Sequence, residues 1–287
     1  MAEVLTVLEV VTRSASFLEK KGIESARLNA ELLIAGAVGL KRMELYVQFD
    51  RPLTEEELAV MRAYVARRGK REPLQYILGE AAFHDLTLKV DPRVLIPRPE
   101  TELLVEKIVD SYSDNGLPLK ILDLGTGSGA IALSLAFYFP QATIIAVDAS
   151  EDALEVAREN AVLNGLANRV DFRQSNWYEA IDKESEHFDL IVSNPPYLTD
   201  DEMVSAEPEV REFEPESALV APNKGLQDLE TIIAGARGLL NPEGVLWLET
   251  GIDQRAALLE QCEQAGYASS EGLDDFSGRE RFIRTSL

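Results

Sequence analysis

The sequence is poor in the residues that form disulfides and metal sites. Among its 287 residues it has one cysteine, Cys262, and two histidines, His84 and His187. A single cysteine excludes a disulfide within the chain. No HExxH motif and no pair of CxxC motifs gives the spacing that a bound metal ion needs. We therefore expect the chemistry to proceed without a metal ion.

Long apolar runs are also missing. The most apolar stretch, AIALSLAFYF at residues 130–139, is about half as long as a segment that crosses a membrane. The first residues, MAEVLTVLEVVTRS, carry acidic side chains where a secretion signal has basic ones followed by an apolar stretch. We expect a cytoplasmic protein without a membrane partner.

Positive charge is scarce in most of the chain. The net charge is −22, from 28 Lys and Arg against 50 Asp and Glu. Residues 1–72 hold 12 basic and 11 acidic side chains, so residues 73–287 hold the other 16 and 39, a net charge of −23. A surface of that sign repels phosphate backbones, which proteins bind with lysine and arginine. We expect no direct nucleic-acid partner, although an acidic surface that only keeps the protein soluble accounts for most of this charge.

The first part of the chain predicts a small helical domain, residues 1–72. Apolar residues recur at helical spacing and stop at a glycine in VLTVLEVVTRSASFLEKKG and in SARLNAELLIAGAVG. Thr54 and Glu57 form the capping box of a further helix, TEEELAVMRAYVARRGK. Residues 73–97 then predict a β-hairpin and a proline-rich linker, with β-rich runs on both sides of His84 in LQYILGEAAFHDLTLKVD.

Residues 98–287 predict an α/β domain. A helix begins near the proline of RPETELLVEK, and from residue 120 apolar strands alternate with helices. Repeated strand and helix units predict a mostly parallel sheet with helices on both faces, and ligands bind such sheets at the carboxyl ends of the strands. The expected strands are KILDLG, TIIAVD, RVDFRQ, FDLIVSN and GVLWLET.

The first of these strands ends in a glycine-rich turn, DLGTGSG. Gly125, Gly127 and Gly129 let the backbone turn tightly and come close to a ligand. Asp148 ends the next strand, where its carboxylate can accept hydrogen bonds from the hydroxyls of a ribose. Such turns serve NAD, FAD or S-adenosylmethionine, and some only allow close packing. The spacing lacks the third-glycine position of the dinucleotide fingerprint, which disfavours NAD.

A second polar corner, NPPY, follows the strand FDLIVS. The amide oxygen of Asn194 and the carbonyl of Pro195 offer two acceptors, and Tyr197 offers a flat wall. Pro195 and Pro196 hold the backbone in one shape, since each fixes φ and neither has an N–H. These features suit a planar NH₂ group, in an amide or an exocyclic amine, whose nitrogen must be oriented to attack a sulfonium methyl group. A proline-terminated strand with an incidental Asn is the alternative for NPPY alone.

Several longer stretches resemble the HemK/PrmC family, the glutamine methyltransferases of peptide chain release factors. They are REPLQYILGEAAFHDLTLKVDPRVLIPRPETELLVE, DLGTGSGAIALSLA, SNWYEAI and NPPY. The resemblance covers nearly the whole chain, as far as GRERFI. Adenine methyltransferases of DNA and RNA share NPPY, whereas QYILGE with VLIPRPETE is specific to the glutamine enzymes. The resemblance implies a Rossmann-like class I S-adenosylmethionine-dependent methyltransferase sheet joined by a β-hairpin to the helical domain.

The activity that the resemblance implies is methyl transfer from S-adenosylmethionine to the glutamine amide of a release factor's Gly-Gly-Gln (GGQ) motif. S-adenosylhomocysteine would be the product, and translation termination would be modulated. The helical domain would recognise the substrate protein. Asn194, Pro195 and Tyr197 would be catalytic, and transfer would be direct, without a covalent enzyme intermediate. Carried over by motif, the cofactor contacts would be Gly125, Thr126, Gly127, Ser128, Gly129, Asp148, Trp177 and Asn194, and the substrate contacts Asn194, Pro195, Pro196 and Tyr197.

The sequence departs from the family pattern at FHDL in the hairpin and at EPESALVAPNKGLQDL. Residues 198–224 form an acidic insertion with eight acids and two bases. We expect it to be a solvated loop, or to face basic residues around the GGQ loop through Glu207, Glu209 and Glu212. The basic run ARRGKRE, residues 66–72, is expected to reflect a helix end that favours cations, or less readily a docking site for the release factor.

Other functions stay open at this point. A ribosomal-protein glutamine methyltransferase would share most of the scaffold. A nucleic-acid adenine methyltransferase would need a basic face to hold the strand from which its base is flipped, which the acidic second part disfavours. A noncatalytic adaptor would not need intact glycine-rich and NPPY corners.

Overall fold

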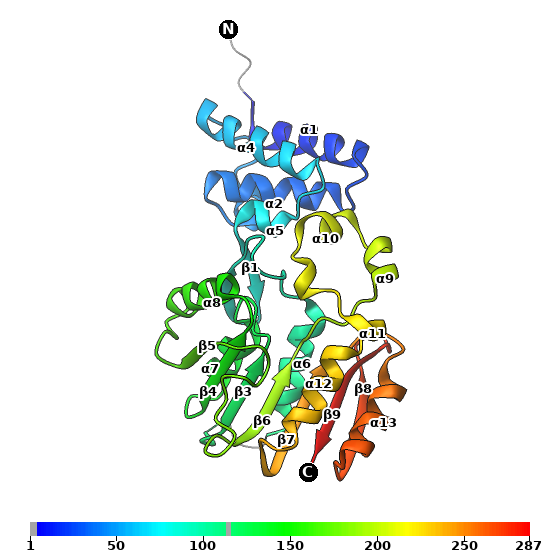
Figure 1. The fold of residues 1–287 in the computed structure, drawn as a ribbon. Coiled ribbons are helices and arrows are strands. Elements are labelled where there is room, and N and C mark those ends of the chain that lie inside the picture. The colour runs from blue at the N-terminus through cyan, green and yellow to red at the C-terminus, as the bar shows by residue number, and fades with distance from the viewer. Residues whose placement is uncertain (1–4, 113–115) are drawn as a thin grey trace. The chain divides into compact units, whose positions relative to one another are not determined.

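The computed structural model describes residues 5–112 and 116–287, which fold into two units (Figure 1). Unit 1 contains the described residues up to Gly79 together with residues 207–213. Unit 2 contains residues 214–287 and the described part of residues 80–206. The chain therefore passes between the units three times. Within the described ranges no helix is long and apolar enough to cross a membrane.

Unit 1 is helical because its segments have helix caps and an apolar face, and these faces pack together in one core around Leu33. The predicted capping box is confirmed: Thr54 Oγ1 accepts from the backbone N–H of Glu57, and the Glu57 carboxylate accepts from the N–H of Thr54. Gly39 ends the second helix in the left-handed conformation. The helices are α1 (Val7–Lys20), α2 (Ala26–Val38), α3 (Arg42–Tyr46), α4 (Glu55–Arg68), α5 (Leu74–Leu78) and α10 (Pro208–Phe213).

The β-hairpin is shorter than the sequence predicted. Residues 74–78, read as part of a β-rich run, form the helix α5, so a strand there is wrong. Pro73 precedes the first turn, where its missing N–H costs nothing, and Gly79 ends the helix with a φ of 79°. The two antiparallel strands that follow are β1 (Glu80–Phe83) and β2 (Leu86–Lys89).

Unit 2 is built on a seven-stranded sheet with the order β5-β4-β3-β6-β7-β9-β8. The first five of these strands are parallel, as predicted, and β9 pairs antiparallel with β7 and β8. The chain runs outward from β3 to β5 and returns to β6 on the other side of β3, which makes a switch point between β3 and β6. The strands are β3 (Lys120–Leu124), β4 (Thr143–Asp148), β5 (Val170–Gln174), β6 (Phe188–Ser193), β7 (Leu240–Glu249), β8 (Ser269–Asp274) and β9 (Glu280–Ser286).

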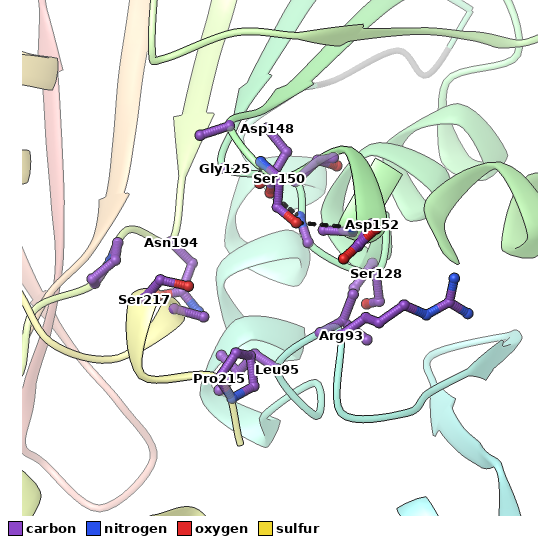
Figure 2. A pocket seen from close by; sticks show the side chains of 18 of the residues that line it. Arg93, Leu95, Gly125, Ser128, Asp148, Ser150, Asp152, Asn194, Pro215 and Ser217 are labelled. Carbon is purple, nitrogen blue, oxygen red and sulfur yellow. Dashed lines mark hydrogen bonds between the residues drawn. The ribbon is translucent and has the colours of Figure 1, made fainter. Parts of the chain in front are cut away.

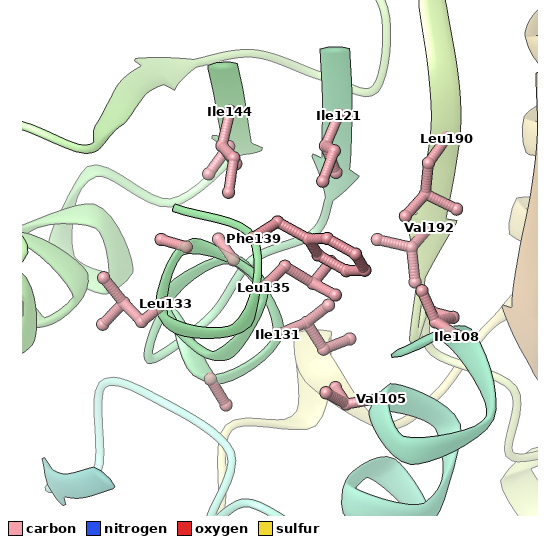
Figure 3. Close-up of a cluster of buried hydrophobic side chains, with 14 of the residues drawn as sticks. Val105, Ile108, Ile121, Ile131, Leu133, Leu135, Phe139, Ile144, Leu190 and Val192 are labelled. Atoms are coloured by element: carbon pink, nitrogen blue, oxygen red, sulfur yellow. The ribbon is translucent and has the colours of Figure 1, made fainter. Parts of the chain in front are cut away.

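Helices cover both faces of this sheet. Ile121 and Leu190 belong to a core cluster with α6 and α7, whereas their neighbours Leu122 and Ile191 belong to a second cluster with α12 and α13. Figure 3 shows the first cluster, with the ring of Phe139 among the strand and helix side chains. A slip of one residue would move the side chains of a strand to the opposite face of the sheet and disrupt both clusters. The two clusters therefore fix the register of the strands and the positions of their ends. The helices are α6 (Pro99–Asp110), α7 (Ala130–Tyr138), α8 (Glu151–Leu163), α12 (Gln227–Ala236) and α13 (Arg255–Ala265).

The acidic insertion contains short helices, and two of its glutamates have partners within unit 1. Arg68 Nη2 donates to Glu209 Oε1 over 2.9 Å, and Arg71 Nη2 donates to Glu207 Oε2 over 2.9 Å. The expectation that these glutamates face a partner's basic residues is therefore corrected: they pair with the chain's own basic run at residues 66–72. Besides α10 the insertion holds α9 (Asp200–Ser205), the 3₁₀ helix η1 (Glu216–Ala218) and the start of α11 (Pro222–Gly225).

Candidate active site

A pocket of about 520 Å³ opens at the carboxyl ends of β3, β4, β5 and β6, within unit 2 (Figure 2). It adjoins the switch point of the sheet, where open α/β folds bind their ligands, and its volume suits a small molecule. Predicted residues that line it are Gly125, Thr126, Gly127, Ser128, Asp148, Trp177, Asn194 and Pro196. Three other predicted residues, Gly129, Pro195 and Tyr197, are described by the structure but lie outside the lining.

The glycine-rich turn presents bare backbone to the pocket. Gly127 has a φ of 55°, and a Cβ added there would meet no atom within 4 Å. The backbone at this point can therefore approach a ligand directly. Gly129 has a packing role instead: it precedes α7, and a Cβ added there would lie 3.1 Å from the side chain of Leu133.

Asp148 is held by backbone N–H groups of two segments that line the pocket. Its Oδ2 accepts from the N–H of Gly127 over 2.8 Å, and its Oδ1 accepts from the N–H of Ser150 over 2.9 Å. Burial raises the pKa of this carboxyl, and the backbone donors oppose that change. The backbone N–H of Ala149 is a third donor. A carboxylate has about four acceptor positions, so the backbone does not fill them all and acceptor capacity remains for a hydroxyl group of a ligand.

A second acid, Asp123, lies beneath the turn and was not predicted as a site residue. Its Oδ2 accepts from Thr126 Oγ1 over 2.6 Å and from the N–H of Ala132 over 3.2 Å. Its Oδ1 is buried without a hydrogen-bond partner, and burial raises the pKa of the carboxyl to about 7. In the sequence Asp123 lies inside the apolar strand KILDLG, and only residues of the turn that follows it were assigned to the site.

Trp177 is placed against the glycine turn by an unusual backbone conformation. Its φ is 50°, a region that a bulky side chain rarely adopts, and its ring would lie 3.5 Å from a Cβ added at Gly125. Ser175 Oγ donates to the carbonyl of Trp177 over 2.9 Å, and the carboxylate of Asp228 accepts from its side chain. Strain of this kind persists only where neighbours fix it, and it is typical of binding sites. Asp228 also lines the pocket and was missed by the sequence reasoning.

The NPPY corner divides between the pocket and the interior. Asn194 lines the pocket and its Nδ2 donates to Thr101 Oγ1 over 3.0 Å. Tyr197 turns inward, and its hydroxyl donates to Glu249 Oε1 over 3.1 Å. Burial and the nearby Glu249 carboxylate raise the pKa of Tyr197, so its hydroxyl stays protonated at neutral pH. In this structure Tyr197 therefore anchors the NPPY segment to the interior through Glu249 and does not line the pocket.

Two further segments form walls of the pocket. Leu95 and Pro97 lie on one, and Pro215 and Ser217 lie on the other (Figure 2). Arg98 Nη2 donates to both oxygens of the Glu214 carboxylate, over 2.7 and 2.9 Å, and the Glu214 side chain is almost fully buried. This ion pair ties the two walls together next to the pocket.

Comparison with known proteins finds similarity along nearly the whole chain. The family described as PrmC N-terminal domain matches residues 9–79, and the one described as Methyltransferase domain matches residues 118–272. The release factor glutamine methyltransferase of Geobacter sulfurreducens is 41% identical over 281 residues, 98% of this chain and 96% of that protein. That of Chlorobaculum tepidum is 40% identical over 285 residues, 97% of this chain and 96% of that protein.

Solved structures of other proteins align with about 70% of this chain. The ribosomal protein L11 methylase of Lactobacillus delbrueckii subsp. bulgaricus aligns with a TM-score of 0.51 and 20% identity, over 69% of this chain and 84% of that one. The N-terminal domain of human METTL16 in complex with SAH aligns with a TM-score of 0.52 and 18% identity, over 70% and 76%. At these identities the likeness shows the fold alone, which is that of the class I S-adenosylmethionine-dependent methyltransferases, as the sequence predicted.

Proposed function

We propose that this chain, which belongs to the release factor glutamine methyltransferase family, transfers a methyl group from S-adenosylmethionine to a glutamine side-chain nitrogen. The acceptor is the glutamine of the GGQ motif in a peptide chain release factor. The resemblance noted in the sequence is confirmed at about 40% identity over nearly the full length. The observation that carries the proposal is the meeting of a glycine turn, Asp148 and Asn194 in one pocket.

The residues around the pocket fit an adenosine-containing methyl donor. The open backbone at Gly127 leaves room for close approach of the donor, and Asp148 keeps acceptor capacity for a ribose hydroxyl. Trp177 offers a flat face for the adenine ring. The buried, unpartnered Oδ1 of Asp123 marks a polar site under the turn that a donor's ammonium group or a water molecule would satisfy. S-adenosylmethionine supplies the reactive methyl group at this site.

The NPPY corner holds the acceptor amide. The Oδ1 of Asn194 accepts one N–H of the glutamine side chain, and the carbonyl of Pro195, which lies between the two lining residues Asn194 and Pro196, accepts the other. With both hydrogens held, the nitrogen lone pair is directed toward the methyl donor, and the positive charge that develops on nitrogen is stabilised. Pro196 lines the pocket beside Asn194 and fixes the backbone. The proton is released to water or to a carbonyl after transfer, and the reaction needs no covalent enzyme intermediate.

Unit 1 supplies recognition of the substrate protein in this proposal, and the reaction takes place in the cytoplasm. The PrmC N-terminal domain match lies within this unit. The acidic character of residues 73–287 supports a protein substrate over a nucleic acid.

The direct test incubates the purified protein and S-adenosylmethionine with an intact release factor and measures the mass of its GGQ tryptic peptide. A factor with that glutamine replaced serves as the control. We expect a gain of one methyl group on the glutamine alone. No gain from a protein that still binds S-adenosylmethionine would overturn the assigned substrate and favour a ribosomal-protein glutamine.

A further inference from the structure

A chain of hydrogen bonds runs from the pocket into the interior below Asn194. Asn194 Nδ2 donates to Thr101 Oγ1 over 3.0 Å, and Thr101 Oγ1 donates to Glu249 Oε2 over 2.7 Å. The other oxygen of Glu249 accepts from the Tyr197 hydroxyl over 3.1 Å. All four residues belong to unit 2: α6 supplies Thr101, β7 supplies Glu249, and the corner after β6 supplies the other two.

The number of available protons fixes the direction of this chain. The Thr101 hydroxyl has one hydrogen, and an ionised Glu249 can only accept, so that hydrogen points at Glu249. Thr101 Oγ1 can then meet Asn194 only as an acceptor. The group of Asn194 that faces Thr101 must therefore be its NH₂, which leaves Oδ1 to the pocket, where the proposed acceptor nitrogen needs it.

We infer that Thr101 and Glu249 are positioning residues that set which end of the Asn194 amide faces the substrate. The inference rests on the proposed function, because it requires that Asn194 Oδ1 accept a hydrogen bond from the substrate amide. A reversed amide would present NH₂ to a substrate NH₂, and two donors cannot bond to each other. Glu249 is fully buried, so no solvent competes for its oxygens, and an acid is kept there at the cost of desolvation.

Protonation of Glu249 would release this constraint. A neutral carboxyl can donate to Thr101, whose own hydrogen is then free to turn toward the Oδ1 of a reversed Asn194. The charged groups around Glu249 are Glu100 from α6 and Arg281 from β9, and the Tyr197 hydroxyl also faces it. Burial dominates over these and raises the Glu249 pKa to about 7, so the two forms coexist near neutral pH.

The test compares Thr101→Val with Thr101→Ser. Valine keeps the shape of the side chain and removes the hydroxyl, whereas serine keeps the hydroxyl. We expect T101V to lower kcat on intact release factor by about 10- to 100-fold while its Kd for S-adenosylmethionine stays within about threefold, because only the reactive geometry is lost. T101S should restore most of the rate. Equal rates in T101V and the wild type, with binding intact, would overturn the inference.

Glu249→Gln provides the second readout, since glutamine has the same shape and does not titrate. The rate of the wild type should fall as the pH drops below about 7, and this loss should be smaller in E249Q. Asp123 has its pKa in the same range, so the difference between the two profiles, and not the wild-type profile alone, reports Glu249. Identical profiles would contradict the role of Glu249.

A measurement without turnover separates this inference from the proposed function. The side-chain NH₂ signals of Asn194, followed by NMR against pH, should move with an apparent pKa near 7 in the wild type and much less in E249Q. If this difference is seen in a protein that fails to methylate release factors, the positioning role of Thr101 and Glu249 is supported and only the assigned substrate is wrong. Equal titration of the Asn194 signals in both proteins would remove the positioning chain itself.

Discussion

The pairing of Arg68 with Glu209 makes a measurable prediction about the helix α10. Only 9% of the Arg68 side chain and 18% of the Glu209 side chain are exposed, and their hydrogen bond is 2.9 Å long. Arg68 is also held by Asn29 Oδ1 and by the carbonyl of Glu72, so little freedom is lost when it binds Glu209. Arg71 Nη2 lies 2.7 Å from the other Glu209 oxygen. Together these contacts hold residues 207–213 in unit 1.

Glu209→Gln keeps the shape of the side chain and removes its charge, which leaves the buried Arg68 guanidinium without its counterion. A charge-assisted hydrogen bond in such a place contributes about 1.5–3 kcal/mol. We expect the local opening of α10 to become easier by about 2 kcal/mol, equivalent to roughly 30-fold faster exchange of its amide hydrogens. Glu207→Gln is the matched control, because the Glu207 side chain is 75% exposed and an ion pair so exposed contributes about 1 kcal/mol at most.

Hydrogen exchange of the peptide that covers residues 207–213, measured by mass spectrometry in both variants, gives the comparison. Raised salt should shrink the effect of E207Q more than that of E209Q, since exposed pairs are screened more strongly. Equal exchange in the two variants, or no change in E209Q, would refute the reasoning that burial decides the strength of these ion pairs.

Three further predictions follow from the pocket and its buried acids. Asn194→Ala should lose most turnover while its affinity for S-adenosylmethionine stays within about tenfold, and near-normal turnover would exclude the proposed contact. Asp148→Ala should mainly weaken cofactor binding, which calorimetric titration checks directly; unchanged affinity would count against the ribose contact. Asp123 and Glu249 have pKa values raised by burial from 3.8 and 4.5 to about 7. Their contribution to stability is therefore present below about pH 4 and is lost as the pH rises to about 7, by up to about 4 kcal/mol for Asp123 and about 3 kcal/mol for Glu249. Urea unfolding of the Asp123→Asn, Glu249→Gln double variant should show a weaker decline in stability over this pH range, and an unchanged decline would contradict the prediction.

Strong local patterns made much of unit 2 predictable from the sequence. The strands β3, β4 and β6 are apolar runs that stop at a polar or glycine-rich corner, and their order along the chain was sufficient to place Gly127, Asp148 and Asn194 at one edge. The LQYIL segment was mispredicted because its four apolar or aromatic residues around Gln75 suit a strand and a short helix equally, and only the flanking Pro73 and Gly79 decide between them.

Other features depend on the tertiary structure and could not be read locally. By residue type alone, Trp177 would be assigned to the hydrophobic core. Its place against the glycine turn depends on its left-handed backbone conformation and on its hydrogen bond to Asp228, which lies on a helix far away in the sequence. The pairing of Glu209 with Arg68 joins residues 141 positions apart. In the sequence each of them belongs to a charged run that is ordinarily solvated, so neither run reveals the other as its partner.

The position of Glu249 at the end of a strand could have indicated from the sequence that it lies near the pocket. It ends the apolar strand GVLWLE, just as Asp148 ends β4 and as Asn194 follows β6. The rule that assigned Asp148 to the ligand edge applies equally to Glu249, because β7 is parallel to β6 and adjacent to it. An acid at the end of a fully buried strand must either reach the ligand edge or find donors inside, since an unpaired buried charge is too costly. Glu249 finds its donors inside, in Thr101 and Tyr197, and reaches the pocket through Thr101 and the Asn194 amide that Thr101 holds.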